Sequence, residues 1–416
     1  MGFIKKEVKH AVAVLQKWTE LDVMYYVRGG AWVFSSQIML VLFSLLLSIG
    51  FAYLTSKETY GQFQFILAVL GVLSTFVLPG ANTAVFLGVA QKKEGTLIQG
   101  TRLKLKYSVL GVLGLLCTAG YFYLRKEPSY EFMWLIFLIA VIFFPVLYSF
   151  DLWGSFFAGR RKFARVSIIQ LSLEGISVLV ALLALFLTKN LLVVVVLYLF
   201  VKAIGEFFAF RYAVSKIANK KIDPDFALYS KHLTVINFIP SIRSYLDKIV
   251  VTFFLGFAAT AVYSIGAAIA EQLYAVAKNI SIITFPKIAV LKQNVYAEVK
   301  RRTGKLVLFF VLIAIIAVLV APYLIPFVFS EQYRVSVPIA QLLLLVTIPR
   351  AVAYFLTKVQ EAKRQSRKLY IINISYALVE IVALLVLAPF YGLYGIIGAK
   401  AISNSVYLGL AWLSLR

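Results

Sequence analysis

The stretch Pro240-Ser-Ile-Arg243-Ser-Tyr-Leu-Asp247-Lys248-Ile-Val-Val-Thr-Phe-Phe-Leu-Gly256 combines a membrane-spanning pattern with three charges. Apolar residues surround it and nothing alternates as in a strand, so it is predicted to be a transmembrane helix. A charge at bilayer depth costs about 2.5–3.5 kcal/mol on insertion scales, and is tolerated where it faces protein or a hydrated cavity. Arg243 and Asp247 are four residues apart, so they share a helix face and can pair. They either face a cavity that the chain builds or form a structural ion pair between helices.

The composition is that of a polytopic membrane protein. Hydrophobic residues make up 62% of the chain, the mean hydropathy is +0.89, and charged residues make up 14%, where about 25% is usual in soluble domains. The net charge of +24 would suit nucleic acid. The basic residues nevertheless fall in alternate short loops, as membrane orientation requires. We therefore expect membrane lipids, and no nucleic acid, as partners.

Twelve spans are predicted, each near the about 20 residues that a bilayer needs. The segment 1–27 before them has apolar residues at helical spacing with lysines between, which is typical of an amphipathic helix on an anionic membrane surface or of a solvated lead-in. The predicted spans are 31–54, 62–90, 107–124, 132–158, 166–188, 191–213, 233–256, 258–286, 305–329, 337–357, 369–389 and 391–414.

The basic residues outside the spans or at their ends predict the orientation. Thirty-one Lys and Arg fall on the side of the termini and five on the other, so the positive-inside rule predicts that both termini are cytoplasmic. No external loop exceeds about ten residues, so no extracellular domain is expected. The chain is predicted to be a multi-pass protein of the cell membrane.

A shift of 203 residues superposes several features of the two halves. Tyr60 then meets Tyr263, Arg161 meets Arg364, and 168–172 meets 371–375. Six spans per half give both halves the same orientation, which predicts a parallel repeat with a central cavity between lobes. The predicted fold is all-α, with an N-lobe (28–213), a cytoplasmic linker (214–231) and a C-lobe (232–416).

The predicted spans hold six acidic and six basic residues, which must turn away from lipid. Lys202 and Glu206 are four apart and are predicted to pair. Lys278 is predicted either to reach the headgroups or to face the cavity. The candidates for substrate binding are Arg243, Lys248, Arg350, Lys202 and Arg28. The candidates for carrying a coupling ion or acting as counter-ions are Asp247, Asp151, Glu174, Glu206, Glu271 and Glu380.

Several energy and metal motifs are missing. The chain has no GxxxxGK[ST] phosphate loop, so a built-in ATPase is not expected. His10 and His232 are its only histidines, so neither a histidine metal site nor a catalytic triad is expected. No cofactor is predicted, and coupling to an H+ or Na+ gradient stays open, because the acidic residues in the spans could equally be fixed counter-ions.

The pattern resembles the Wzx-like polysaccharide flippases of the multidrug/oligosaccharidyl-lipid/polysaccharide exporter superfamily. Members of that family handle O-antigen and other lipid-linked oligosaccharides. The resembling stretches are Leu54-Thr-Ser-Lys-Glu-Thr-Tyr-Gly-Gln-Phe63, Leu78-Pro-Gly-Ala-Asn-Thr-Ala84, Asp247 through Tyr263, and Thr284-Phe-Pro-Lys287. The resemblance implies transport of a polyprenyl-diphosphate-linked oligosaccharide from the cytoplasmic to the outer leaflet by alternating access, alongside glycan polymerase machinery. A sugar diphosphate cannot cross hydrocarbon unaided, because its polar groups would lose their hydrogen bonds.

Two alternatives stay open at this point. A cation-coupled multidrug exporter belongs to the same superfamily, but such exporters resemble one another in an aspartate in the first span, where this chain has only Gln37. A membrane enzyme such as a glycan polymerase or ligase would need a sizeable external loop, which is not predicted. The chain is therefore not expected to be an enzyme.

Overall fold

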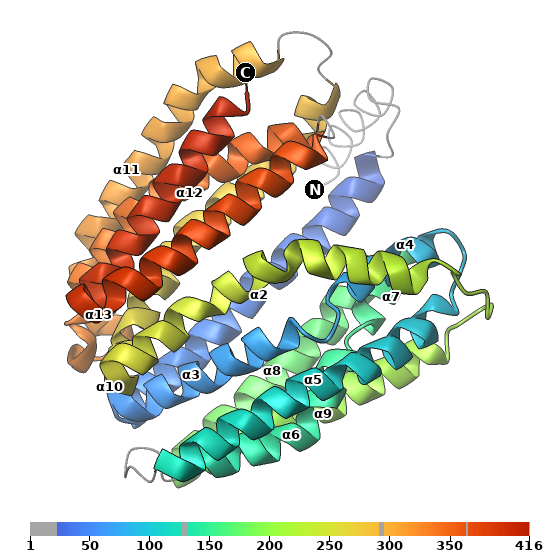
Figure 1. Ribbon diagram of the computed structural model, residues 1–416, viewed down its shortest axis with the longest axis horizontal. Coiled ribbons are helices and arrows are strands. Elements are labelled where there is room, and N and C mark those ends of the chain that lie inside the picture. The colour runs from blue at the N-terminus through green and yellow to red at the C-terminus, as the bar shows by residue number, and fades with distance from the viewer. Residues whose placement is uncertain (1–22, 126–131, 291–294, 363–364, 416) are drawn as a thin grey trace, which may run out of the picture. The chain divides into compact units, whose positions relative to one another are not determined.

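The structure, a computed structural model, describes residues 23–125, 132–290, 295–362 and 365–415, with no account of the side chains of residues 23–31, 279, 281–302, 362 and 366 (Figure 1). Every regular element within the described ranges is a helix, so the predicted all-α class is confirmed. Of the predicted amphipathic segment 1–27, residues 1–22 lie outside the described residues.

The helices follow the apolar runs of the sequence. Backbone N–H and C=O groups find no water in hydrocarbon, so a spanning segment satisfies them internally as a helix. The elements are α2 (Val23–Leu54), α3 (Lys57–Ser74), α4 (Gly80–Ala90), α5 (Thr96–Arg125), α6 (Met133–Ser149), α7 (Trp153–Gly159), α8 (Phe163–Thr188), α9 (Leu191–Val214), α10 (Phe226–Val290), α11 (Val295–Phe329), the 3-10 turn η2 (Glu331–Tyr333), α12 (Ser336–Ala362) and α13 (Ser366–Leu413).

Nine helices of the described part are long and apolar enough to cross a membrane. Two of them, in α10 and α13, are 53 and 47 residues long, which is enough for two crossings each at 1.5 Å per residue. Each is interrupted by a glycine in the left-handed region, Gly256 with φ of 85° and Gly392 with φ of 57°. These positions coincide with the predicted boundaries between spans, and α3 with α4 completes the twelve.

Two predicted spans are broken, which sequence reasoning did not anticipate. The span 62–90 divides into α3 and α4 at Leu78, which has a positive φ of 49°, and at Pro79, which has no N–H to continue a helix. The span 132–158 divides into α6 and α7 around Asp151. Broken helices at membrane depth are tolerated where protein surrounds them. Polar side chains lie beside both breaks: Asn82 follows the first break, and Asp151 lies in the second.

The chain divides into two compact units. The first holds α2 as far as Leu47 together with Val77–Ala184 and Leu192–Lys231, and the second holds Ser48–Phe76, Leu185–Leu191 and the described residues from His232 onward. Each has its own apolar core, around Phe156 and Phe157 in the first and around Leu356 and Tyr407 in the second. This division differs from the predicted lobes in placing residues 48–76 and 185–191 with the second unit, and the lobe boundaries stay a prediction.

The loop after α4 holds the segment between α9 and α10 against the first unit. Glu94 accepts hydrogen bonds from Arg160 Nε at 2.8 Å, from Arg160 Nη2 at 2.5 Å and from the backbone N–H of Ala218 at 2.5 Å. Lys93 pairs with Asp223 at 3.1 Å. These contacts tie residues 215–225 to the loop at 91–95, and we call this set of contacts the linker clamp.

The linker clamp predicts a pH-dependent stability. Burial alone would raise the pKa of Glu94, but hydrogen bonds from Arg160 and the Ala218 N–H outweigh it and hold that pKa below its ordinary value of 4.5. A carboxyl group with a depressed pKa stabilises the fold above the unfolded pKa and loses this contribution as the pH falls through the folded value. We expect Glu94→Gln to lower the free energy of unfolding by about 1–3 kcal/mol at pH 7 and by less at pH 4, measured by thermal unfolding in detergent.

Glu331→Gln serves as the control, because Glu331 pairs with Arg334 on an exposed surface and exposed pairs contribute little. A Glu94→Gln deficit that is the same at pH 4 and pH 7 would contradict the assignment.

Candidate functional site

A chain of ion pairs connects α10 with α13 inside the second unit. Lys400 Nζ lies 3.0 Å from Asp247 Oδ2 and 3.2 Å from Glu380 Oε1. Glu380 also accepts a 2.8 Å hydrogen bond from Arg243 Nη1, and Tyr263 donates its hydroxyl to Asp247 at 2.6 Å. Asp247 is 8% and Glu380 1% exposed. Buried carboxylates of this kind are stable only with such partners.

Two arginines of the second unit lie over tyrosine rings. The guanidinium of Arg243 is 4.3 Å from the ring centroid of Tyr376, and that of Arg350 is 3.8 Å from Tyr274. Arg350 Nη1 also lies 2.5 Å from Glu271 Oε1, and the charges of the two arginines interact. Both Nε atoms are buried and have no hydrogen-bond partner among the described residues. The pair therefore has N–H donors to offer to an incoming anion.

Lys248 is held by a neutral side chain. Its Nζ donates to Gln64 Oε1 at 2.7 Å, and Gln64 Nε2 donates to the Tyr60 hydroxyl at 2.9 Å. Within the described ranges no carboxylate forms a salt bridge with Lys248. The amide that accepts this hydrogen bond is neutral, so it does not offset the charge of the lysine.

The first unit has a polar cluster at the two helix breaks. Lys104 Nζ lies 2.6 Å from Asp151 Oδ1, and Asn82 bridges the pair, accepting from Lys104 at 3.0 Å and donating to Asp151 Oδ2 at 3.1 Å. Asn82 lies in the first turn of α4, and Asp151 lies between α6 and α7. The interruptions bring these side chains to the buried Lys104, whose side chain is 3% exposed.

A second polar group of the first unit lies between α8 and α9. Lys202 Nζ is 2.8 Å from Glu174 Oε2 and donates to the Tyr198 hydroxyl at 2.9 Å. Glu206 accepts a 2.6 Å hydrogen bond from Trp153 Nε1. Among the described residues Glu206 has no salt-bridge partner, which sets it apart from Glu174.

The ion pairs repeat between the two halves of the chain. Glu174 on the fifth span pairs with Lys202 on the sixth, and Glu380 on the eleventh pairs with Lys400 on the twelfth. A carboxylate on one span and a lysine on the next thus recur in corresponding helices, which agrees with a parallel repeat.

Two predicted pairings are wrong. Arg243 bonds Glu380 rather than Asp247, and Lys202 bonds Glu174 rather than Glu206. The four-residue spacing placed each couple on one helix face, but a bond across to another helix provides a better-oriented partner for these side chains. Pairs four apart on one helix contribute only about 0.2–0.5 kcal/mol, so tertiary contacts override them readily.

Of three other basic residues, Lys104, Lys278 and Arg28, the structure describes the side chains of the first two. Lys104 precedes the predicted span 107–124, yet it is a buried member of the first polar cluster. Nothing in the neighbouring sequence distinguishes it from Arg102 and Lys106. Lys278 is exposed and lies 4.7 Å from the ring centroid of Tyr274. The side chain of Arg28 lies outside the described part. The roles assigned to the candidates stay predictions.

Comparisons with solved structures identify the fold. The chain is 15% identical to the lipid II flippase MurJ in an inward closed conformation, with a TM-score of 0.74 over 93% of this chain and 87% of that one. An inward-facing multidrug resistance MATE transporter of the MOP superfamily gives 12% identity and a TM-score of 0.68 over 91% and 94% of the two chains. A MOP superfamily transporter from Pyrococcus furiosus gives 13% identity and a TM-score of 0.62 over 93% of this chain and 95% of that one. The TM-scores, over most of each chain, show that these proteins share the fold of this chain.

No curated protein matches the chain in sequence. The proteins that share its fold are transporters and flippases rather than enzymes, in line with the prediction. A family model, described as polysaccharide biosynthesis protein, matches residues 26–292. That match covers more than half of the sequence, including the charged stretch of α10 and the polar clusters of the first unit. The chain is therefore a multi-pass membrane protein that belongs to the polysaccharide biosynthesis protein family.

Proposed function

We propose that the protein is a flippase that moves a polyprenyl-diphosphate-linked oligosaccharide from the cytoplasmic to the outer leaflet by alternating access. The observation that carries this proposal is the pair of partly buried arginines, Arg243 and Arg350, each lying over an aromatic ring with a buried Nε that has no hydrogen-bond partner among the described residues. The likeness to a lipid II flippase and membership of a polysaccharide biosynthesis family support it.

The charge balance of the second unit favours an anionic ligand. Its ionic cluster has four cations against three carboxylates, and one of the cations, Lys248, is held by an amide. The members of this cluster are Arg243, Lys248, Arg350, Lys400, Asp247, Glu271 and Glu380. A diphosphate would supply the missing negative charge through charge-assisted hydrogen bonds, the stronger kind at low dielectric.

The polar groups of the first unit suit the coupling ion instead. They include three carboxylates, Asp151, Glu174 and Glu206, against two lysines, Lys104 and Lys202. Glu206 is the carboxylate whose described partner is a neutral Trp153 N–H. A carboxyl group in that setting can take up and release a proton or bind Na+ as the gradient drives the cycle.

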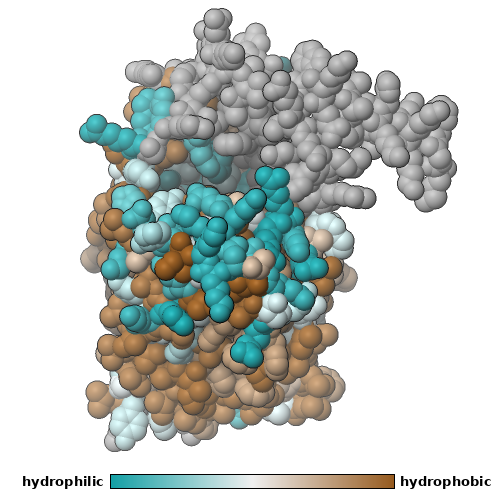
Figure 2. Space-filling model, turned by 90° about the vertical axis from the view of Figure 1, so that its right-hand side faces the viewer, coloured by the Kyte–Doolittle hydropathy of each residue, from teal (hydrophilic) through white to brown (hydrophobic). Residues whose placement is uncertain are grey.

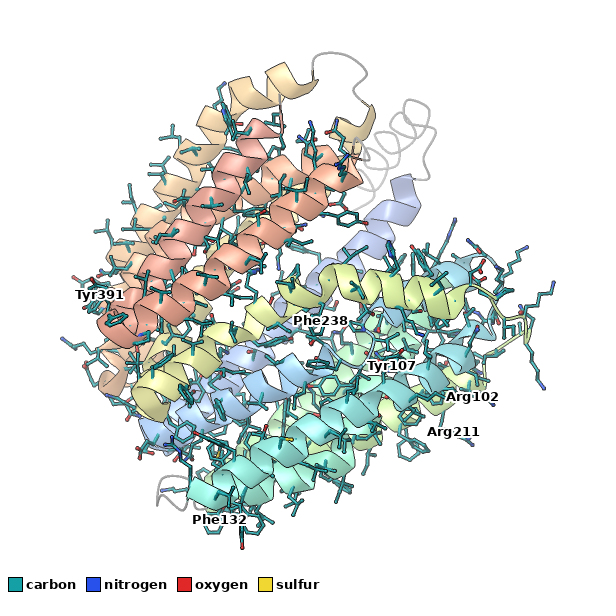
Figure 3. All side chains as sticks on the ribbon, in the orientation of Figure 1. Arg102, Tyr107, Phe132, Arg211, Phe238 and Tyr391 are labelled. Atoms are coloured by element: carbon teal, nitrogen blue, oxygen red, sulfur yellow. The ribbon has the colours of Figure 1, made fainter. Side chains whose placement is uncertain are left out.

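The direction of transport follows from the proposed orientation. Arg102 and Arg211 lie at one end of the helices of the first unit, and Phe132 lies at the opposite end (Figure 3). The basic end would face the cytoplasm by the positive-inside rule, placing both termini of this cell-membrane protein inside the cell. The glycan polymerase machinery would then receive the lipid-linked product on the outer side.

Arg350→Gln tests the proposal with little structural disturbance. The variant removes the cation but leaves Glu271 with a side chain that is 51% exposed and can be hydrated. Because a hydrogen bond to a charged group contributes about 1.5–3 kcal/mol, we expect the flipping rate of a fluorescent polyprenyl-diphosphate oligosaccharide in proteoliposomes to fall at least about tenfold.

Arg334→Gln is the matched control, since Arg334 belongs to an exposed pair in the same unit. This variant should flip the lipid-linked oligosaccharide at the wild-type rate. Wild-type flipping by Arg350→Gln would rule out the arginine as a diphosphate ligand. Export of cationic drugs by vesicles that do not flip the lipid would favour a multidrug exporter.

A further inference from the structure

The first unit has a cavity that the proposed transport does not use. It has a volume of about 450 Å³, within the range of small-molecule sites, about 300–1,000 Å³. One wall is a single face of the first turns of α5, formed by Ile98, Gln99, Arg102, Leu103 and Lys106 at helical spacing. This wall therefore combines apolar and basic side chains on one helix face.

The opposite wall comes from the segment after α9 and the start of α10. It includes Lys220, Ile222 and Phe226. Gln99 fixes this wall, because its Nε2 donates to the Asp223 carbonyl at 3.1 Å and its Oε1 accepts from the Asp223 N–H at 3.4 Å. The backbone N–H of Gly95 donates to the Lys221 carbonyl at 2.9 Å. The cavity is thus held open by the same segment that the linker clamp secures.

Three cations edge the cavity without a carboxylate partner. Arg102, Lys106 and Lys220 are exposed, and in the described part of the chain none of them forms a salt bridge. The nearby Asp223 is already paired with Lys93. The cavity therefore offers an uncompensated positive rim around apolar walls, which suits a ligand with an anionic head and a hydrocarbon chain.

The level of the cavity along α5 indicates where that ligand comes from. Directly after Lys106 the helix exposes large apolar side chains, including Val109 at 55%, Leu110 at 48% and Leu113 at 52%. These are the residues that face hydrocarbon, so the rim lies where the headgroups meet the chains. Hydrophilic side chains gather on the face of the molecule at which α4 and α7 end, and apolar ones adjoin them (Figure 2).

We propose that this cavity is a binding site for an anionic phospholipid of the membrane. The phosphate contacts Arg102, Lys106 and Lys220, and an acyl chain enters along Leu103 and Ile222. A lipid bound there bridges α5 and the segment before α10, and so stabilises the linker clamp.

The test titrates the purified, delipidated full chain with phosphatidylglycerol or phosphatidylcholine and counts bound lipid by native mass spectrometry. We expect the wild type to prefer phosphatidylglycerol. Each Lys or Arg near an anionic lipid contributes about fivefold in affinity. The triple variant Arg102→Gln, Lys106→Gln, Lys220→Gln should therefore lose about a hundredfold in affinity for phosphatidylglycerol, together with the preference.

The control triple variant Arg165→Gln, Arg211→Gln, Lys216→Gln removes the same charge from exposed positions outside the cavity. It should keep the phosphatidylglycerol affinity. An equal loss in both triple variants, or a wild type without preference, would overturn the proposal, because diffuse surface charge would then explain the binding.

The apolar wall is tested separately with Ile222→Gln. Ile222 is 58% exposed, so the change should not affect folding. It should lower the affinity for phosphatidylglycerol about tenfold, because it removes apolar contact with the acyl chain. Leu228→Gln, at a 73% exposed position of α10 outside the cavity, should have no effect. Equal affinity of the wild type for glycerol phosphate and for phosphatidylglycerol would show that the site takes free phosphate rather than a lipid.

Discussion

Replacing Lys400 with methionine is expected to destabilise the protein by about 3–5 kcal/mol, the effect of removing one partner from a buried ion pair. Lys400 lies between two carboxylates, 3.0 Å from Asp247 and 3.2 Å from Glu380. Methionine has a similar volume but no charge, so both carboxylates lose the cation they share. Glu380 keeps Arg243, whereas the hydrogen bonds left to Asp247 among the described residues come from the neutral Tyr263 hydroxyl and the backbone N–H of Lys248.

The measurement is unfolding in mixed micelles followed by circular dichroism, with Lys358→Met as the control. Lys358 pairs with Glu361 three residues along the same helix, where the Glu361 side chain is 48% exposed, and such pairs contribute about 0–1 kcal/mol. The double variant Lys400→Met, Asp247→Asn should recover part of the loss, because the unpaired charge is then removed. A Lys400→Met protein as stable as the control would contradict the buried network.

Gly61→Ala is expected to destabilise the second unit by more than about 3 kcal/mol, above the usual range for overpacking. A Cβ atom at this position would lie 1.8 Å from the carbonyl oxygen of Phe257 and 2.5 Å from its carbonyl carbon. Those atoms are backbone and cannot rotate away. They also directly follow Gly256, where α10 is interrupted, so α3 would have to move away from that break.

Gly120→Ala on α5 is the matched control, since no heavy atom lies within 4 Å of the added Cβ. Alanine loses less chain entropy than glycine in a helix, so this variant should be more stable by about 0.5–1 kcal/mol. Thermal unfolding of both variants in one detergent measures the difference. If Gly61→Ala also stabilised the protein, the close approach of α3 to α10 would be wrong.

The Tyr60-Gly61 stretch shows how a diffuse motif acquires a physical meaning. In the sequence it was one of several loosely spaced resemblances to a flippase family. In the structure Gly61 admits the backbone of Phe257, and Tyr60 supports Gln64, which holds Lys248. Gly61 thus allows the helix contact, and the hydroxyl of the preceding Tyr60 supports the charged site.

The number of spans was predictable because it depends on local properties. An apolar run of about 20 residues crosses a bilayer whatever its neighbours do, and the two predicted boundaries in α10 and α13 fall at the left-handed glycines Gly256 and Gly392. The breaks beside Leu78 and Asp151 were missed, since proline and polar residues also occur inside continuous spans. Pro145 lies within α6 without ending it.

The sequence by itself determined the class of protein, the number of crossings and the need for buried charges to find partners. Only the tertiary structure decided which partners they find. Arg243 bonds Glu380, 137 residues away, and Lys104 bonds Asp151, 47 residues away. Burial in an apolar segment is a property of neighbouring residues, whereas an ion pair depends on how separate helices pack, and helical spacing along one chain does not encode that packing.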